Sequence, residues 1–591
     1  MSIFLFLLPL LLFPACSRSL PSAGAQTISW EEGDQTRVDF SGRSALVRGP
    51  GAVFSSGDLT ISQEGTYVLT GSLEGGRILI NAPRSDRVVL VLNGLSLRSD
   101  GGPAIYAQRS RELHLVLEEG TVNSIRDGTQ GRNDDHNAAI YSQHDIQISG
   151  GGTLRVEGNY HHGIRSQDIL TIHGGNIEVR SLGDALRGRD AIIIHQGNFS
   201  LHAEGDGLQS NNPNGGEAGQ ITIYGGVFEI QAGNDGIQAE SSLTIYGGDF
   251  SILAGGGSAN APPRTRNNRG GGRGGWGWNP APAVPESESQ KGLKAKTLVH
   301  ILGGTFVIDA ADDGIHSDGD VLIGGGTFTI STGDDGINGD GAVVITGGDI
   351  HITESYEGIE GMTVTISGGR VRVFARDDGL NATGGSSRND MAIRITGGHV
   401  EVHALADGID SNGNVFLEGG TLMISGPSQM MNGAIDQDGQ FFISGGELIT
   451  AGSVLSVAPS STQPAILLSY ARQESAGTRI SISDSRGNII LEYTALMAFS
   501  YSGFTSPAFR IGETYTLHIN GTARTEITLG AMLTRLSDNG GTYNQGRGGF
   551  NQGGGRMPPG TPPPGGLPPG FGEPQRRAPP SGPGPGWGGT I

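Results

Sequence analysis

Apolar and polar residues alternate in short runs along most of the chain, and pairs of glycines separate the runs. The stretch LTIHGGNIEV at residues 170–179 shows this unit, with one alternating run on each side of Gly174 and Gly175. A period of two is typical of β-strands that bury one face, and glycine permits the positive φ that a sharp corner needs. The pattern therefore predicts two strands joined by a tight Gly-Gly corner.

The unit recurs at a nearly constant spacing. One large aliphatic residue, here called the anchor, marks each copy, and successive anchors lie 24, 22, 22, 29, 56, 22, 22, 22, 21 and 29 residues apart. A single copy cannot bury its apolar face alone, so the copies must stack in parallel about 4.8 Å apart. The sequence predicts an all-β fold, a parallel β-helix with coils of about 22 residues. The anchors are Ile140, Ile164, Leu186, Leu208, Ile237, Leu293, Ile315, Ile337, Ile359, Leu380 and Ile409.

The extent of the repeat also divides the chain. A Gly/Arg/Pro-rich insert at 255–290 interrupts the repeats, and both this insert and the C-terminal tail have the composition of disordered segments. The predicted divisions are a signal peptide at 1–16, a linker and first strand at 17–58, the parallel β-helix at 59–452, a small β module at 453–533 and a Gly/Pro-rich tail at 534–591.

The N-terminal residues predict export. The apolar run from Ile3 to Phe13 is too short to span a membrane and has the character of a signal-peptide core. Cys16, the only cysteine, follows this run as in bacterial lipoproteins, so it is the expected lipid attachment site and no internal disulfide forms. No Lys or Arg precedes the run, which leaves a freely secreted form or a wrongly assigned start as alternatives. The expected location is extracellular or on the cell surface.

Composition and charge narrow the function classes. The 59 Asp and Glu residues outnumber 39 Lys and Arg, and the net charge of −20 argues against a nucleic-acid partner. The 103 glycines do not recur at every third position, so the chain is not collagen-like. The negative charge favours cations, or ligands carried by cations, as partners. The chain is expected to be a monomer.

An acidic residue precedes the glycine of the repeat in most units. If the units stack in register, these carboxylates form a column with about 4.8 Å between neighbours, and each adjacent pair repels by about 1 kcal/mol in water. Such a column needs cations, and Ca²⁺ takes roughly 6 to 8 oxygen ligands. The alternative is that the Asp-Gly pairs only form turns on a solvated edge. The predicted Ca²⁺ ligands are Asp206, Asp235, Asp312, Asp313, Asp334, Asp335, Glu357, Asp377, Asp378, Asp407 and Asp410.

Basic residues lie two positions after the glycine or alanine of several repeats. They are Arg165, Arg187 and Lys294, and His316 has the corresponding place in the next unit. These cations, together with Ca²⁺, would hold the carboxylates of an acidic polysaccharide, so Arg165, Arg187 and Lys294 are the predicted carbohydrate-binding residues. The alternative is that each is a solvated charge on the outside of a coil.

Several segments together resemble a family of secreted bacterial carbohydrate-binding domain-containing proteins. They are the DDGI units with their TITGG-type strands, Asn137 to Gly175, SYEGIEG at Ser355 to Gly361, and Phe504 to Gly521. The resemblance implies a right-handed parallel β-helix similar to pectate lyases, bound Ca²⁺, and binding of polygalacturonate and cellulose without cleavage. The chain departs from the family pattern at Ala185, His162 and Met431-Asn432, where the acid is displaced or absent, so the early and late coils are expected to lack the metal.

Three functions remain open. The first is a Ca²⁺-dependent protein that binds acidic polysaccharides such as pectin and is not an enzyme. The second is a polysaccharide lyase, in which Ca²⁺ acidifies the uronate α-proton and Lys294, Arg187 or Arg165 acts as the base. The third is a structural adhesin whose repeats only hold its two ends apart.

Overall fold

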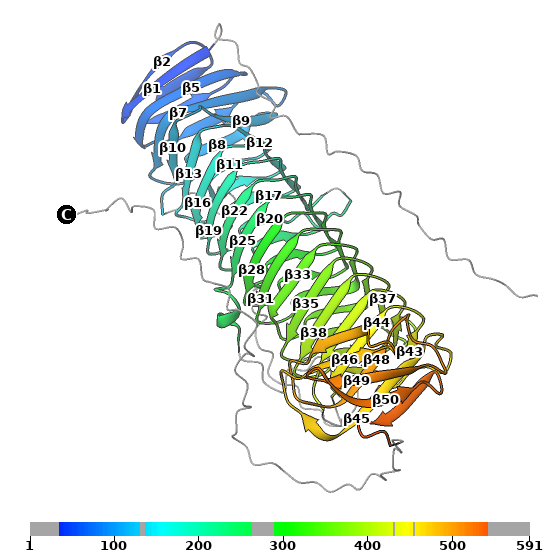
Figure 1. Cartoon of the computed structure of the whole chain (residues 1–591). Coiled ribbons are helices and arrows are strands. Elements are labelled where there is room, and N and C mark those ends of the chain that lie inside the picture. The colour runs from blue at the N-terminus through cyan, green and yellow to red at the C-terminus, as the bar shows by residue number, and fades with distance from the viewer. Residues whose placement is uncertain are drawn as a thin grey trace, which may run out of the picture.

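The fold is built almost entirely from β-strands. A computed structural model describes residues 35–129, 136–216, 218–262, 289–428, 432–452 and 455–541. The described residues form strands β1 to β51 and a short 3-10 turn, η2 (Ser258–Asn260), and contain no α-helix. One mostly parallel sheet contains 47 strands and a second sheet contains four. The all-β prediction is therefore confirmed, and Figure 1 shows the strands stacked into one elongated body.

Each repeat contributes three strands, and each strand pairs in parallel with its counterpart in the next repeat. The first, which we call the anchor strand, contains the anchor, and in β32 (Ile337–Ile345) and β34 (Ile359–Ile366) it runs on into the second strand. The other anchor strands are β8 (Ile105–Arg109), β11 (Ala138–Ser142), β14 (His162–Ser166), β17 (Leu186–Gly188), β20 (Leu208–Ser210), β23 (Ile237–Ala239), β26 (Leu293–Ala295), β29 (Ile315–Ser317), β36 (Leu380–Ala382), β39 (Ile409–Ser411) and β42 (Ile435–Gln437).

The second and third strands of each repeat lie on either side of the glycine corner. The second strands are β9 (Glu112–Leu117), β12 (Asp145–Gly150), β15 (Ile169–Ile172), β18 (Ala191–Ile194), β21 (Gln220–Ile223), β24 (Ser242–Ile245), β27 (Leu298–Ile301), β30 (Asp320–Ile323), β37 (Ala392–Ile395), β40 (Asn414–Leu417) and β43 (Phe441–Ile443). The third strands are β10 (Val122–Arg126), β13 (Thr153–Gly158), β16 (Asn176–Ser181), β19 (Asn198–Ala203), β22 (Val227–Ala232), β25 (Asp249–Ala254), β28 (Thr305–Ala310), β31 (Thr327–Thr332), β33 (Asp349–Glu354), β35 (Arg370–Ala375), β38 (His399–Ala404), β41 (Thr421–Ser425) and β44 (Glu447–Gly452).

The predicted anchors all stack on one another in the core. Each pairs with the next from Ile140 to Ile409, and the line extends through Ile105 and Ile78 to Leu59 at one end and to Ile435 at the other. A second line consists of buried phenylalanine rings with centroids 4.5–4.7 Å apart and nearly parallel planes. These rings belong to Phe199, Phe228, Phe250, Phe306 and Phe328.

The glycine corners follow the predicted geometry in their second residue. Gly175 has φ +109°. Positive φ also occurs at the second glycine of further Gly-Gly pairs of the repeat, at Gly226, Gly248, Gly348, Gly369, Gly398 and Gly420. The glycine before most anchors has a different role, because a Cβ on Gly207 would lie 2.5 Å from the carbonyl oxygen of Gly236 in the next repeat. Alanine stands at this position before Ile140, Leu186 and Ile435, so the close spacing of repeats leaves room for at most a small side chain.

Antiparallel strands cover the two ends of the stack. At the N-terminal end, β1 pairs antiparallel with β2 and parallel with β5, so parallel stacking begins upstream of residue 59. At the other end, β44 pairs antiparallel with β48, and a four-stranded sheet β47-β46-β49-β50 packs over a second core that β44, β45 and β48 also line. Covering the ends limits edge-to-edge pairing with other chains. The N-terminal strands are β1 (Gln35–Gly42), β2 (Ser44–Arg48), β3 (Ala52–Ser55), β4 (Asp58–Ile61), β5 (Gly65–Gly75), β6 (Ile78–Asn81) and β7 (Arg87–Ser99). The C-terminal strands are β45 (Ala465–Glu474), β46 (Arg479–Ser483), β47 (Ile489–Thr494), β48 (Phe499–Thr505), β49 (Thr514–Ile519), β50 (Thr522–Thr528) and β51 (Leu533–Ser537).

Candidate functional site

One position in each repeat, two residues before the anchor, carries most of the predicted metal ligands. We call this line of residues the column, and it lies in the turn that enters each anchor strand. All its aspartates except the partly buried Asp378 are buried, with Asp235 only 1% and Asp313 only 3% exposed, so most of the column is not a solvated edge. From N to C the column contains His162, Asp184, Asp206, Asp235, Lys291, Asp313, Asp335, Glu357, Asp378, Asp407 and Gly433.

Backbone hydrogen bonds link successive members of the column. The N–H of Asp206 donates to Oδ1 of Asp184 at 3.1 Å, the N–H of Asp235 to Oδ1 of Asp206 at 3.0 Å, and the N–H of Lys291 to Oδ1 of Asp235 at 2.8 Å. The same bond joins Asp335 to Asp313, Asp407 to Asp378, and Gly433 to Asp407. One oxygen of these aspartates is therefore satisfied by the fold itself.

From Asp184 to Asp335, the second oxygen of each column aspartate contacts one of a line of side chains that runs along the anchor strands. We call this line the outer row, and its members pair in register from one repeat to the next. Its sequence is basic and amide-rich at first and becomes acidic towards the C-terminal end. From N to C the outer row contains Tyr141, Arg165, Arg187, Gln209, Gln238, Lys294, His316, Asn338, Glu360, Asn381, Asp410 and Asp436.

The predicted carbohydrate-binding residues all belong to the outer row. Arg187 lies 3.0 Å from Oδ2 of Asp184, and the Lys294 ammonium lies 3.5 Å from Oδ2 of Asp235. Arg165 donates to the amide oxygen of Asn137 and lies over a neighbouring tyrosine ring. The three cations thus share one face of the stack, and each also has a partner within the protein.

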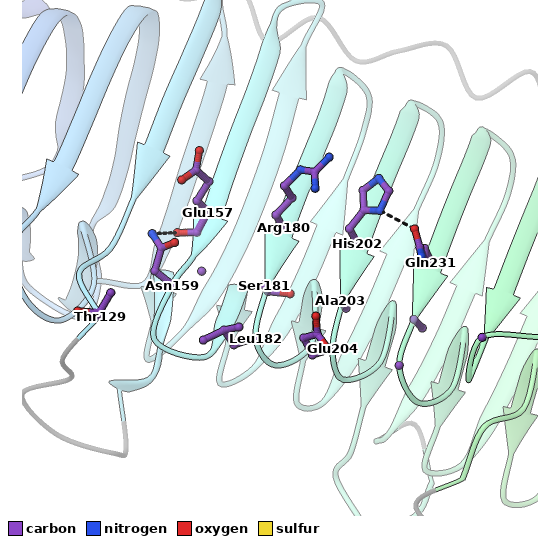
Figure 2. Close-up of a pocket in the computed structure, with 14 residues that line it drawn as sticks. Thr129, Glu157, Asn159, Arg180, Ser181, Leu182, His202, Ala203, Glu204 and Gln231 are labelled. Atoms are coloured by element: carbon purple, nitrogen blue, oxygen red, sulfur yellow. Dashed lines mark hydrogen bonds between the residues drawn. The ribbon is translucent and has the colours of Figure 1, made fainter. Parts of the chain in front are cut away.

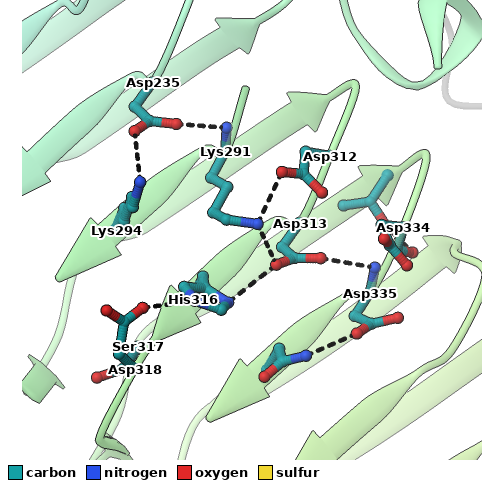
Figure 3. Close-up of polar contacts among 12 residues, drawn as sticks. Asp235, Lys291, Lys294, Asp312, Asp313, His316, Ser317, Asp318, Asp334 and Asp335 are labelled. Atoms are coloured by element: carbon teal, nitrogen blue, oxygen red, sulfur yellow. Dashed lines mark hydrogen bonds and ion pairs between the residues drawn. The ribbon is translucent and has the colours of Figure 1, made fainter. Parts of the chain in front are cut away.

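In the middle of the column a lysine replaces the aspartate. The Lys291 ammonium lies 2.7 Å from Oδ2 of Asp312 and 2.6 Å from Oδ2 of Asp313, as Figure 3 shows. His316 contacts the same oxygen of Asp313 at 2.9 Å through Nδ1. Asp312, Asp313 and Asp334 have carboxylate oxygens within 4.8 Å of one another. The protein's own ammonium therefore supplies the positive charge at this predicted metal cluster.

The carboxylates at the C-terminal end of the column and of the outer row beside it have no such compensating cation. We call this group the acidic end, and among the described residues none of its carboxylates forms an ion pair with Lys, Arg or His within 4 Å. Asn381 is only 7% exposed and donates to Oε2 of Glu357 at 2.6 Å and of Glu360 at 2.9 Å, while its own Oδ1 is buried without a hydrogen-bond partner. A buried carbonyl oxygen and several carboxylates are the donor set that Ca²⁺ takes. The acidic end consists of Glu357, Glu360, Asp377, Asp378, Asp407, Asp410 and Asp436.

Burial and mutual repulsion change the protonation of these groups. Burial, reinforced by hydrogen bonding and repulsion from Glu360, raises the pKa of Glu357 to about 9. Burial and neighbouring carboxylates raise the pKa of Asp378 to about 8, of Asp407 to about 7 and of Asp410 to about 6. Without a cation, Glu357 and Asp378 therefore retain protons at neutral pH, and a bound divalent cation would displace them.

The middle of the column behaves in the opposite way. Burial opposes ionisation of Asp313, but the charge of Lys291 and the contact with His316 hold the pKa of Asp313 well below its usual range. Burial also opposes the charged form of His316, and its contacts with Asp313 outweigh this and raise the pKa of His316. This part of the column is ionised and internally neutralised, so it differs chemically from the acidic end.

The comparisons with known proteins place the chain in a family. A sequence model of the carbohydrate-binding domain-containing proteins matches residues 55–336 and 334–463, which is most of the chain. The chain belongs to this family. A member from Acetivibrio thermocellus is 31% identical over 136 residues, which cover 22% of this chain and 48% of the relative. The chain thus matches about half the length of that carbohydrate-binding domain-containing protein.

A solved structure also resembles part of the chain. It is described as a gadolinium derivative of the polysaccharide lyase-like protein from C. thermocellum. The similarity covers 38% of this chain and 92% of the other, with 28% sequence identity and a TM-score of 0.37. Carbohydrate binding is the general function that membership of the carbohydrate-binding domain-containing family supports.

Two column residues were missed by the sequence reasoning. Asp184 lies in the column although Ala185 replaces the usual glycine, so the expected absence of the acid at that repeat is wrong. Lys291 was missed because only acidic residues were sought before the glycine. For both residues, counting two positions back from the anchor would have given the right place. His162 stands in the column as a hydrogen-bond acceptor, because its Nδ1 accepts from the N–H of Asp184 at 2.9 Å.

Other predictions fall outside the described residues. These include the apolar run at residues 3–13, Cys16, most of the insert, and the tail beyond residue 541. Within the described ranges, no helix has both the length and the apolar character that crossing a bilayer requires.

Proposed function

We propose that this carbohydrate-binding domain-containing protein is an exported, Ca²⁺-dependent binder of acidic polysaccharides such as polygalacturonate. The proposal includes a right-handed parallel β-helix, location outside the cell or at its surface, and lipid attachment at Cys16. It assigns no catalytic activity to the chain.

The outer row is the observation that carries the proposal. One continuous face changes from cations at Arg165, Arg187 and Lys294 to carboxylates at Glu360 and Asp410, with all members in register. A polyanion gains favourable contacts over the basic repeats, but over the acidic end it meets like charge. Binding along the whole face therefore needs cations at the acidic end.

The residues of the acidic end would hold the calcium. Asp378, Asp407 and Asp410 each have carboxylate oxygen without a charged partner in the described structure, and Asn381 adds its buried Oδ1. Bound Ca²⁺ would supply the positive charge that attracts sugar carboxylates to this end. The Lys291 cluster is already neutralised, so we assign the calcium to the acidic end in preference to Asp312, Asp313 and Asp334.

The geometry of the candidate bases supports binding without cleavage. A lyase base must be neutral when it takes the α-proton. Lys294 and Arg187 instead form ion pairs with the buried carboxylates of Asp235 and Asp184, so each is already engaged within the protein.

The test is co-sedimentation of the exported chain with insoluble polygalacturonate, in Ca²⁺ and in chelator. We expect binding in Ca²⁺, little binding in chelator, and no rise in the ultraviolet absorbance that unsaturated uronide ends would give. The double variant Asp378→Asn, Asp407→Asn should lose the Ca²⁺ dependence. Asp249→Asn, at the exposed start of β25, is the matched control and should bind as the wild type does. Rising absorbance would make the chain a lyase, and equal binding in both buffers would remove calcium from the proposal.

A further inference from the structure

A second surface feature lies away from the outer row, on the third strands of the repeats. A groove of about 560 Å³ runs from Thr129 to Gly256 across β13, β16, β19 and β22, and Figure 2 shows its lining. A smaller hollow of about 350 Å³ beside Arg98 shares Thr129 and Asn159 with this groove and so continues it towards the N-terminal end. The turn that carries the column separates this groove from the outer row.

Small buried residues recur beneath the groove, where the third strands end. Gly158, Ser181, Ala203 and Ala232 pair in register along four successive repeats, and all four border the groove. Ala203 and Ala232 also belong to the hydrophobic core. The base of the groove is therefore formed by the stacked strands of the repeat.

Polar side chains form a line along the groove. Glu157, Arg180, His202 and Gln231 pair in register and line it, and Figure 2 shows them on adjacent strands. Three steps of the stack separate the first from the last, about 14 Å. The spacing gives one polar group for each step, which suits an extended ligand whose repeating units are of similar length.

Most charges near the groove are paired within the protein. Arg126 lies 3.1 Å from Glu157, and Arg98 lies 3.1 Å from Glu74. His202 shares a hydrogen bond of 3.0 Å with Gln231. In the described part of the chain, the exposed guanidinium of Arg180 has neither an ion pair nor a hydrogen bond.

The rim adds two further kinds of contact. Leu182 is 60% exposed beside Arg180 and offers an apolar surface to the C–H face of a sugar. Glu204 lines the same groove with an exposed carboxylate that can accept hydroxyl hydrogen bonds. Because Glu157 is paired with Arg126, the negative charge at the rim comes from Glu204, which would repel a ligand with a carboxylate on every unit. The groove therefore suits hydroxyl groups and a single isolated anion.

We propose that this groove is a second glycan site, which takes a linear glycan with an uncharged backbone and isolated uronic acid substituents. The backbone lies along the line of polar residues, and Arg180 holds one substituent carboxylate. The site needs neither calcium nor the outer row, so it is separate from the polygalacturonate face and goes beyond the function proposed above.

The experiment uses affinity gel electrophoresis of the exported chain with two matched probes. One is glucuronoxylan, and the other is the same polymer after reduction of its carboxyl groups. In chelator we expect retardation by glucuronoxylan and about tenfold weaker binding to the reduced polymer, as for loss of one charged hydrogen-bonded contact. Arg180→Gln should weaken glucuronoxylan binding by a similar factor and should bind both polymers equally.

Controls separate this proposal from the previous one. Arg155→Gln alters an exposed arginine on β13 that pairs with Glu178 outside the groove, and it should bind both polymers like the wild type. Leu182→Asp should weaken binding to both polymers, because the apolar rim is lost. Arg180→Gln should leave binding to polygalacturonate in Ca²⁺ unchanged. Equal retardation by both polymers, or wild-type retardation of Arg180→Gln, would overturn the groove site. Loss of polygalacturonate binding with glucuronoxylan binding retained would contradict only the calcium-dependent site and not the groove site.

Discussion

The ammonium of Lys291 lies 2.6 Å from Oδ2 of Asp313, across one step of the stack. Lys291 occupies a place that holds an aspartate in most other repeats, and its N–H still donates to Asp235 as an aspartate's would. Lysine at this position therefore keeps the backbone hydrogen bond between successive column residues and changes only the charge. It divides the column into a middle part neutralised by the protein and an acidic end that is not.

Removal of this lysine should strongly destabilise the fold. Lys291→Met leaves the buried carboxylate of Asp313 without its main partner, and loss of one member of a buried ion pair costs about 3–5 kcal/mol. We expect a lower midpoint of thermal unfolding in chelator. Added Ca²⁺ should raise the midpoint of Lys291→Met more than that of the wild type, because the ion replaces the missing charge near Asp312 and Asp334.

An exposed lysine nearby provides the control. Lys296 pairs with Glu240 at 2.8 Å, but its side chain is 57% exposed, so Lys296→Met should change the unfolding midpoint little. If Lys291→Met unfolds at the same midpoint as Lys296→Met, the ammonium is not the counter-charge of this cluster.

The column aspartates act first as hydrogen-bond acceptors, which the pair Asp206→Asn and Asp206→Ala can test. Oδ1 of Asp206 accepts from the N–H of Asp235, and an asparagine keeps this acceptor. Asp206→Ala leaves that buried N–H unsatisfied, at a cost of about 1–3 kcal/mol. Chemical denaturation should show a small effect for Asn and the larger loss for Ala. Equal losses of stability in the two variants would mean that the charge of Asp206 matters more than its hydrogen bond to Asp235.

The periodic features could be read from the sequence, and the partners of individual side chains could not. The anchors were placed correctly from Ile140 to Ile409 because one apolar residue recurs at each turn of the stack. The column was also placed, but Lys291 and Asp184 were missed because the search followed acidic residues and glycine. That Lys291 reaches into the next repeat depends on side-chain packing, which spacing along the chain does not determine. The groove was missed because small residues at strand ends have no strong pattern of their own.

The stacked phenylalanines should contribute strongly to stability. Phe250 lies between Phe228 and Phe306 with ring centroids 4.6 and 4.7 Å away, and it is 3% exposed. Phe250→Ala should cost about 3–5 kcal/mol, because it opens a cavity in a core that continues through neighbouring repeats. Val307→Ala, at a site 51% exposed, is the control and should change the unfolding midpoint little. A small effect of Phe250→Ala would show that the adjacent repeats close over the cavity.

Stability in chelator should fall as pH rises. The raised pKa values of Glu357 (about 9) and Asp378 (about 8) mean that the folded chain binds more protons than the unfolded chain, whose carboxyls titrate near pH 4. The stabilisation is therefore complete below about pH 4 and is lost progressively as pH rises towards about 9.

Calcium should remove this dependence, because the ion replaces the protons at the acidic end. Thermal unfolding from pH 5 to 9 should show a falling midpoint in chelator and a flatter profile in Ca²⁺. The double variant Glu357→Gln, Asp378→Asn should flatten the chelator profile, since neither amide titrates. Calcium binding at pH 7 should also release protons, which calorimetry in buffers of different ionisation enthalpy can measure. A chelator profile that rises with pH, or calcium binding without proton release, would show that these carboxyls are ionised before the metal arrives.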